Sequence, residues 1–163
     1  MVGSNLVKIL SNSDKVTKVI PSSRNETNLF SFEETSKSIT AAKPDLIINA
    51  AAKVGGILAN NTYRADFILE NLKININILE SIVQHPQIKL INLGSSCIYP
   101  LEAEIPTKEE SFMTGKLEPT NSPYAMAKIA AIEMGSALKN QYGHKIINLM
   151  PTNLYGPKDN FDL

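Results

Sequence analysis

The stretch 89-KLINLGSSCIYP-100 joins a short apolar run to a turn of small and hydroxyl-bearing residues. A short apolar run that ends at a glycine is typical of a strand buried on both faces of a parallel sheet. Ligand sites in open parallel sheets lie at the carboxyl ends of the strands. We therefore expect residues 89–94 to form a buried strand, and the serines and the cysteine after it to border a site.

Similar apolar runs recur along the chain and alternate with longer stretches in which apolar residues return at helical spacing. This alternation predicts an α/β fold built on a doubly wound parallel sheet. The other strands are expected at residues 16–20, 45–51 and 145–150, and the helices at residues 4–10, 32–42, 63–84 and 123–142. Residues 99–122 read as a long irregular connection, which in a compact domain is usually functional.

The composition excludes several classes of protein. Sixteen basic and 16 acidic residues in a chain of 163 give a net charge of zero, so there is no broad footprint for nucleic acid or an anionic membrane. No apolar run reaches the about 18 residues of a membrane span, and the start lacks a signal peptide, so a cytoplasmic location is expected. A lone Cys97 excludes an intrachain disulfide, and with only His85 and His144 as histidines no metal site is expected.

Tyr124 and Lys128 form a Y-x-x-x-K motif near the start of a predicted helix. Residues four apart share a helix face, so the phenol and the ammonium project together. A free tyrosine titrates at about pH 10, and an adjacent cation lowers that pKa toward the range useful for acid–base catalysis. Taken alone, the motif is more often a solvated or packed pair without a catalytic role.

Two further segments end predicted strands. The Ser95 hydroxyl, after residues 89–94, could hydrogen-bond a substrate carbonyl while Tyr124 transfers a proton, although a serine-rich strand exit is the alternative. The segment 49-NAAAKVGG-56 ends the preceding strand in small residues. Small residues allow a cofactor to approach the backbone closely, but they also suit a plain turn.

Five strings, in this order and at these spacings, resemble the GDP-L-fucose synthase family, a branch of the extended short-chain dehydrogenases/reductases. They are NAAAKVGG (49–56), ANNTYRADF (59–67), LGSSCIYP (93–100), LEPTNSPYAMAK (117–128) and MPTNLYGPKDNF (150–161). The similarity runs from Met1 to Phe161. It implies a Rossmann-like sheet, NADP(H) as the cofactor and a GDP-sugar as the substrate, which is epimerised at C3 and C5 and reduced at C4.

The resemblance also implies residue roles. Ser95, Tyr124 and Lys128 match the catalytic triad, in which the tyrosine protonates the C4 oxygen, the lysine lowers its pKa and holds the nicotinamide ribose, and the serine orients the carbonyl. Cys97 matches the acid–base residue of the epimerisation. A small buried hydrophobe is the alternative reading of this cysteine.

The cofactor would be bordered by residues from five segments. In the order of the chain, they are Gly3, Arg24, Asn49, Ala51, Lys53, Tyr124, Lys128, Pro151, Asn153 and Leu154. Arg24 could pair with the 2′-phosphate of NADP, with a solvated surface arginine as the alternative. Asn71 matches an asparagine that supports the active site in relatives. Family members are usually dimers through two long helices, which residues 63–84 and 123–142 match.

The chain also departs from the family. Gly3 supplies only the last glycine of the dinucleotide fingerprint, and the first strand is not found before it. The partner histidine and the substrate lobe lie, in the family, beyond Leu163. Residues 1–163 are therefore expected to be a partial NADP-binding domain, lacking the first strand and the C-terminal substrate domain. Another nucleotide-sugar epimerase or dehydratase, or a non-catalytic remnant, are the alternatives.

Overall fold

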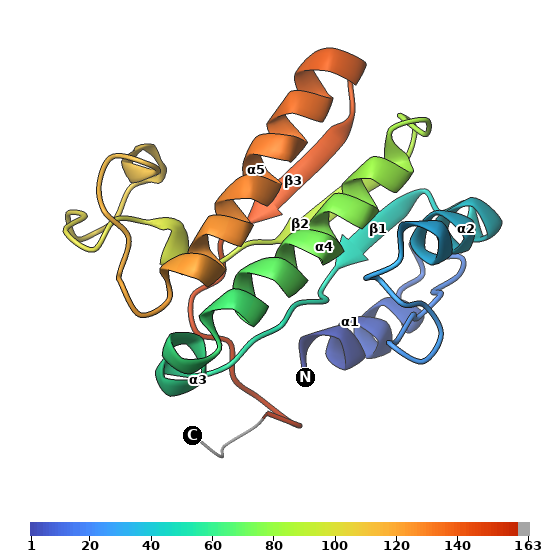
Figure 1. Cartoon of the computed structure of the whole chain (residues 1–163). Coiled ribbons are helices and arrows are strands. Elements are labelled where there is room, and N and C mark those ends of the chain that lie inside the picture. The colour runs from blue at the N-terminus through green and yellow to red at the C-terminus, as the bar shows by residue number, and fades with distance from the viewer. Residues whose placement is uncertain (160–163) are drawn as a thin grey trace.

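The computed structural model describes residues 1–159 and contains a parallel three-stranded sheet (Figure 1). Its strands are β1 (Leu46–Asn49), β2 (Lys89–Leu93) and β3 (Lys145–Leu149), in the order β1-β2-β3. Leu46 pairs with Lys89, which pairs in turn with Lys145, so the three strands begin and end at the same level. The carboxyl ends of all three strands therefore meet along one edge of the sheet.

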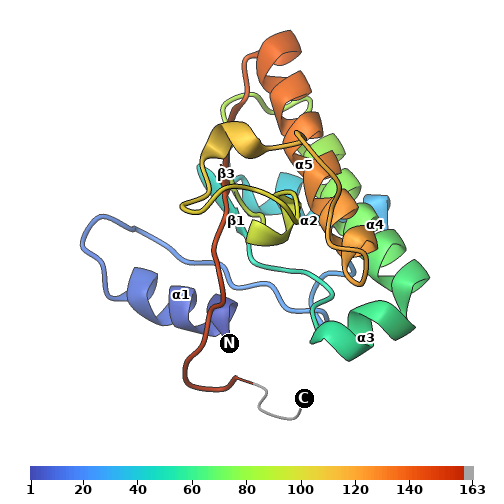
Figure 2. The ribbon, with the colours of Figure 1, turned by 90° about the vertical axis from the view of Figure 1, so that its left-hand side faces the viewer.

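Helices cover the two faces of the sheet unequally. The long helices α4 (Arg64–Ile82) and α5 (Ser122–Tyr142) connect consecutive strands and lie together on one face, with α2 (Phe32–Ala42) beside α4. Helix α1 (Val2–Ser11) lies on the opposite side of the sheet (Figure 2), and none of its residues is buried. Three short elements, α3 (Ile57–Thr62), η1 (Ser96–Ile98) and η2 (Glu109–Ser111), lie in the connections.

The main core lies between α4 and the sheet. Ile74, Ile78 and Ile82 recur every four residues, so they share one face of α4, and they pack with the buried Ile88 and Leu90. Each fully buried side chain of this size contributes about 1.5–3 kcal/mol to stability. This packing, rather than intrinsic helix propensity, fixes α4 across the sheet.

Asparagines form a ladder at the carboxyl end of the same sheet face. Asn49, Asn92 and Asn148 share one register position on the three strands. The Asn49 amide donates to Asn92 Oδ1 at 2.9 Å and to Asn75 Oδ1 of α4 at 3.3 Å, and Asn92 donates to Asn148 Oδ1 at 3.3 Å. These bonds satisfy amides that would be costly to bury unpaired.

Helix ends follow ordinary capping rules. The Ser31 side chain accepts a hydrogen bond from the Glu34 backbone N–H at 3.2 Å and begins α2. Gly143 ends α5 in the left-handed conformation with φ 75°, where a side chain would be strained. Both α2 and the end of α5 lie where the sequence predicts them.

One predicted strand is absent, and one short helix was not expected. Residues 16–20 are irregular, because within residues 1–159 no strand lies beside β1 on the edge away from β2 to give them ladder partners. The sheet that is described therefore has three strands rather than four. Helix α3 follows the glycines 55 and 56, in a stretch too short for a helical pattern to be recognised.

The remaining predicted elements agree with the structure to within a few residues at their ends. Residues 99–121 form the predicted irregular connection, interrupted only by η2. No helix in the part of the chain that the structure describes is long and apolar enough to cross a membrane.

Candidate active site

The carboxyl end of β2 is held against the end of β3 through Gly94. The Gly94 N–H donates to the Leu149 carbonyl at 2.7 Å, and the Ser96 N–H donates to the Pro151 carbonyl at 3.2 Å. A Cβ on residue 94 would lie 2.6 Å from Met150 Sδ and 2.9 Å from the Leu149 oxygen. Only glycine permits this close approach, which brings the segments after both strands together.

Ser95 and Cys97 lie on a tight turn directly after this glycine. Ser95 Oγ accepts a hydrogen bond from the Cys97 N–H at 3.2 Å and so begins η1. Ile98 is buried and anchors the turn in the core. Ser95 and Cys97 are both half-buried residues, as a site that opens toward a ligand requires.

Tyr124 and Lys128 reach the same place from the first turns of α5. The Lys128 Nζ donates to the Leu93 carbonyl at 2.7 Å, at the end of β2, and lies 5.6 Å from the Tyr124 ring centroid. Phe67 of α4 packs edge-on against the tyrosine ring at a centroid distance of 6.3 Å. Four of the predicted site residues, Ser95, Cys97, Tyr124 and Lys128, therefore gather where β2 ends.

Burial dominates the electrostatics of this group. Lys128 is 3% exposed, and burial lowers its pKa to about 8. Burial is also the main cause that raises the pKa of Tyr124; the nearby Cys97 charge raises it further, and a hydrogen bond with Ser95 opposes the shift. The pKa of Tyr124 is raised, whereas the sequence predicts that Lys128 lowers it. The reason is that desolvation of the phenolate outweighs any effect of Lys128.

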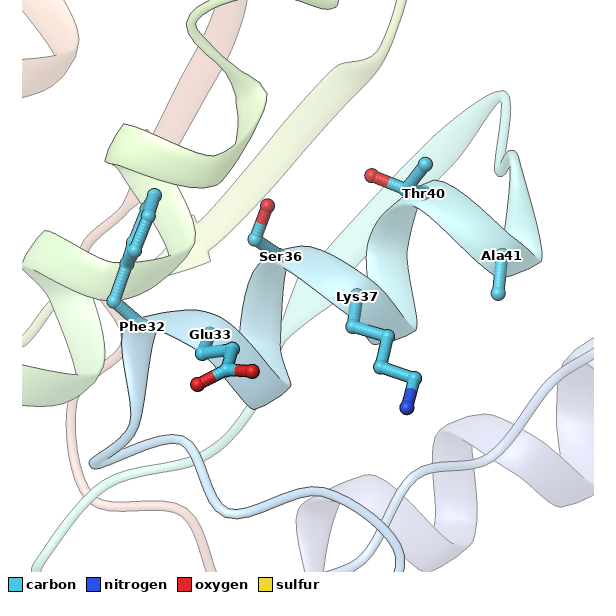
Figure 3. A pocket seen from close by; sticks show the side chains of 6 residues that line it. All are labelled: Phe32, Glu33, Ser36, Lys37, Thr40 and Ala41. Carbon is cyan, nitrogen blue, oxygen red and sulfur yellow. The ribbon is translucent and has the colours of Figure 1, made fainter.

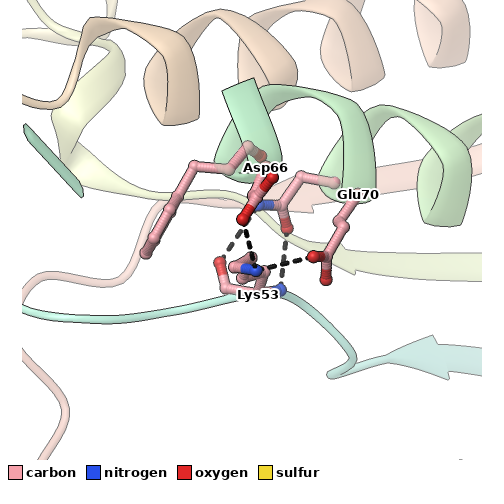
Figure 4. Close-up of polar contacts among 5 residues, drawn as sticks. Lys53, Asp66 and Glu70 are labelled. Carbon is pink, nitrogen blue, oxygen red and sulfur yellow. Dashed lines mark hydrogen bonds and ion pairs between the residues drawn. The ribbon is translucent and has the colours of Figure 1, made fainter. Parts of the chain in front are cut away.

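The segment after β1 is fixed by α4. The Lys53 N–H donates to Asn71 Oδ1 at 3.1 Å, and the Asn71 amide donates back to the Lys53 carbonyl at 3.0 Å. The Lys53 ammonium lies 2.6 Å from Glu70 and 3.6 Å from Asp66 (Figure 4). The hydrogen bond with Glu70 raises the pKa of Lys53. The carboxylates thus hold this lysine charged beside the strand ends.

The start of α1 lies next to the end of β1. A Cβ on Gly3 would lie 3.9 Å from Ala50 Cβ, and one on Gly156 would lie 3.8 Å from Met1 Sδ. The first turn of α1 has no acidic residue and no side-chain cap. Its first backbone N–H groups are thus not used by a side chain, and they lie beside the small residues that follow β1.

The whole of this arrangement agrees with a comparison to known protein families. Residues 1–163 match the model of the NAD dependent epimerase/dehydratase family. The chain belongs to this family.

Named relatives agree with this membership. The chain is 50% identical over 163 residues to a GDP-L-fucose synthase of Sinorhizobium fredii, covering 100% of this chain and 51% of that protein. It is 47% identical over 161 residues to the GDP-L-fucose synthase of Escherichia coli K12, covering 99% and 50%. The chain spans about half the length of the curated relatives it matches.

Solved structures show the same fold. A GDP-D-glycero-L-gluco-heptose synthase from Campylobacter jejuni, solved in the presence of NADPH, superimposes with a TM-score of 0.90 at 35% identity. The match covers 98% of this chain and 46% of that chain. The predicted Rossmann-like α/β class is therefore confirmed.

Other residues predicted to border a cofactor in this epimerase/dehydratase family member are placed less uniformly. The Asn49 side chain is 5% exposed and belongs to the asparagine ladder, so only its backbone can border a ligand. Pro151 is tied to Ser96, whereas Asn153 and Leu154 are exposed beyond β3. The Arg24 guanidinium lies 6.0 Å from the Phe30 ring centroid, and within residues 1–159 no hydrogen bond or ion pair joins it to the rest of the site.

The residues that hold the segment before α5 were not predicted from the sequence. The Glu118 carboxylate accepts hydrogen bonds from the backbone N–H groups of Thr120 and Asn121. The Arg64 guanidinium donates to the Pro119 carbonyl at 2.8 Å, from the start of α4. Asn121 in turn contacts Cys97. The position of Asn121, three residues before Tyr124 at the start of the helix, is the feature of the sequence that could have indicated a role near the site.

Two negative findings delimit the site. A shallow hollow on the outer side of α2 is lined by residues of that helix alone, from Phe32 to Ala41, and lies away from the strand ends (Figure 3). Among residues 1–159, no three His, Cys, Asp or Glu side chains come together as metal ligands. The last two residues of the resembling string 150–161 lie outside the described residues.

Proposed function

We propose that this chain carries the catalytic half of a GDP-L-fucose synthase, which converts GDP-4-keto-6-deoxy-D-mannose to GDP-L-fucose by 3,5-epimerisation and NADPH-dependent 4-reduction. One observation carries the proposal. At the end of β2 the structure brings together Ser95, Cys97, Tyr124 and Lys128. The chain that carries them is 50% identical in sequence to a GDP-L-fucose synthase over 163 residues. Residues 1–163 then form part of its NADP-binding domain.

The residues around the strand ends fit a dinucleotide. The uncapped first turn of α1 offers backbone N–H groups to a pyrophosphate, and Gly3 leaves the space beside Ala50 open. The family resemblance supports Lys128 as the residue that holds a ribose hydroxyl and Arg24 as the residue that meets a 2′-phosphate. When bound, NADPH supplies the hydride that reduces C4 of the sugar.

Reduction at C4 requires a proton for the developing alkoxide. Tyr124 donates this proton, and its raised pKa keeps the phenol protonated at neutral pH. Ser95, whose hydroxyl opposes the rise in the pKa of Tyr124, holds the carbonyl oxygen beside the phenol. Lys128 stabilises the phenolate that forms, because its ammonium lies 5.6 Å from the ring centroid.

Epimerisation requires removal and return of protons at C3 and C5. These protons are acidic because the carbanion left behind is stabilised by the C4 ketone as an enolate. Cys97 is one of the two acid–base residues that inversion at a carbon requires. It exchanges a proton on one face of the sugar, and a partner on the opposite face, the histidine that the family carries beyond Leu163, exchanges the other. Cys97 is half-buried and lies near Tyr124, which supports a role of both residues in one site.

A reductase that acts on another GDP-sugar is the second candidate. The heptose synthase of Campylobacter jejuni shares the fold at a TM-score of 0.90, so the fold alone does not select the sugar. A non-catalytic remnant is the third candidate. Proton exchange at C3 and C5, together with reduction at C4, separates the synthase from both.

The test uses the protein that carries this chain, with GDP-4-keto-6-deoxy-D-mannose in deuterated water. In Tyr124→Phe, NADPH oxidation should fall by about 10²–10⁴-fold while deuterium still enters C3 and C5. In Cys97→Ser, deuterium incorporation should be lost. Undiminished turnover in Tyr124→Phe, or undiminished exchange in Cys97→Ser, would reject the assignment.

Assembly and location remain predictions. Leu69 and Ile76 of α4 and Met126 of α5 are exposed apolar residues on the two long helices, which supports the expected homodimer. We also expect the protein to act in the cytoplasm. Sedimentation of the protein, with and without Leu69→Lys, tests the dimer.

A further inference from the structure

Asn121 occupies the N-cap position of α5 but does not cap the helix. Asparagine at this position usually accepts a hydrogen bond from a backbone N–H of the first turn. Here its side chain makes no such bond, and its Nδ2 instead lies 3.4 Å from Cys97 Sγ. Its Oδ1 is buried and has no hydrogen-bond partner. Giving up the cap and burying an unpaired oxygen both lower stability.

The backbone around Asn121 is clamped in this arrangement. Glu118 accepts hydrogen bonds from Thr120 N and Asn121 N, each at 3.1 Å. Arg64 donates to the Thr120 carbonyl and the Ser122 hydroxyl, which flank Asn121 on the chain. The Asn121 carbonyl accepts the first helical bond, from Ala125 N at 3.0 Å. The backbone from which the carboxamide projects is therefore held in place before any ligand binds.

A carboxamide suits a sulfur that changes its protonation state. Its N–H donates to a thiolate and thereby favours the charged form. After a half-turn of the amide, the same group presents an oxygen that accepts from the thiol S–H. The free Oδ1 supplies that second state. A residue that both takes and returns protons needs a neighbour of this kind.

We propose that Asn121 is the positioning residue of Cys97, whose carboxamide holds the sulfur in place and hydrogen-bonds to it in both protonation states. This inference rests on the proposed role of Cys97 in epimerisation. Tyr124 is the titratable neighbour that senses the Cys97 charge, and Arg64 and Glu118 are the charged groups that hold the segment of Asn121. The side chain of Asn121 acts on the sulfur directly and touches the reaction only through it.

The decisive variant is Asn121→Ser, because serine is a good N-cap and should preserve the start of α5 while removing the amide. The pH dependence of alkylation by iodoacetamide, read on the Cys97 peptide by mass spectrometry, reports the thiol pKa. We expect alkylation at neutral pH to slow about tenfold, because the thiolate loses its hydrogen-bond donor. Deuterium entry at C3 and C5 should fall by at least the same factor.

Ser122→Ala is the matched control, since Ser122 belongs to the same clamped segment but its hydroxyl contacts Arg64 and Pro119 rather than the sulfur. It should leave the alkylation profile unchanged. An unchanged alkylation profile in Asn121→Ser would overturn the inference, as would a shift of equal size in the control. Alkylation needs no sugar substrate, so this result stands apart from failure of the proposed function, which retained exchange in Cys97→Ser would reveal.

Discussion

At the scale of single residues, the buried Lys128 is expected to set the upper pH limit of reduction. Burial lowers its pKa to about 8, so the ammonium is charged below that pH and loses its charge above it. Tyr124 has a raised pKa and stays protonated through the same range, so it does not cause this loss. The rate of NADPH oxidation should therefore be level below about pH 8 and fall about tenfold per unit above it.

Lys128→Met provides the comparison, because methionine fills the buried position without a charge. This variant should be slow at every pH and should lack the decline above pH 8. Steady-state rates at saturating cofactor, measured for both proteins at about ten pH values between about 6 and 9.5, test this prediction. A wild-type rate that stays level to pH 9.5 would contradict the prediction that loss of the Lys128 charge limits reduction.

At Gly94 the addition of a single methyl group should destabilise the fold around the site. An alanine Cβ would approach the Leu149 oxygen to 2.9 Å and Met150 Sδ to 2.6 Å, and the Leu149 oxygen belongs to the backbone. Gly94→Ala should lower the free energy of unfolding by about 1–3 kcal/mol. Gly3→Ala is the control, since its Cβ would meet only Ala50 at an ordinary 3.9 Å. Urea denaturation of both variants measures the difference, and equal losses would contradict the strain at Gly94.

At the scale of secondary-structure elements, the asparagine ladder joins the three strands to α4. Asn92→Leu removes the central member, which takes from Asn49 one of its acceptors and leaves Asn148 Oδ1 without its donor. The loss in free energy of unfolding should be about 1–3 kcal/mol. Replacing Asn92 and Asn148 together by leucine should cost less than the sum of the two single changes, because fewer amides are left unpaired. Additive losses in a double-mutant cycle would show that the two side chains do not interact.

The elements that the sequence could predict are those whose pattern is local. The apolar run before Gly94 and the four-residue repeat of Ile74, Ile78 and Ile82 contain their own periods, so β2 and α4 were found. The strand expected at residues 16–20 failed because a strand also needs a partner, which no local pattern supplies. The partners of the Asn121 side chain depend on which segments meet in space, so its contact with Cys97 could not be predicted.

The candidate site was predicted well where it lies on a motif and poorly where it depends on burial. Ser95, Tyr124 and Lys128 were expected to meet, and they meet at the end of β2. The direction of the Tyr124 pKa was missed, because the sequence shows the cation four residues away but not the depth of the phenol. The same holds for Asn49, whose side chain turned out to serve the core.

At the scale of the whole molecule, the two faces of the sheet differ in how well they are covered. Helices α2, α4 and α5 lie on one face, whereas among the helices of residues 1–159 only α1 lies on the other (Figure 2). A hollow of about 510 Å³ remains there, and its lining is almost wholly apolar: Val2, Leu6, Ile48, Ile91, Leu93, Leu149, Met150, Pro151 and Leu154. On the same face, Ile147 is 57% exposed. Apolar surface of this extent promotes association.

The 163-residue chain by itself should therefore bind the dye ANS and scatter more light as its concentration rises. Ile147→Lys should reduce both signals severalfold, because it places a charge in the middle of the apolar face. Ile105→Lys is the control: Ile105 is 95% exposed but lies in the connection between β2 and α5, so the same charge there should change neither signal. If the two variants behave alike, net charge rather than the uncovered face governs association. If the unaltered chain gives neither signal, α1 covers the sheet better in solution than its lack of buried residues implies.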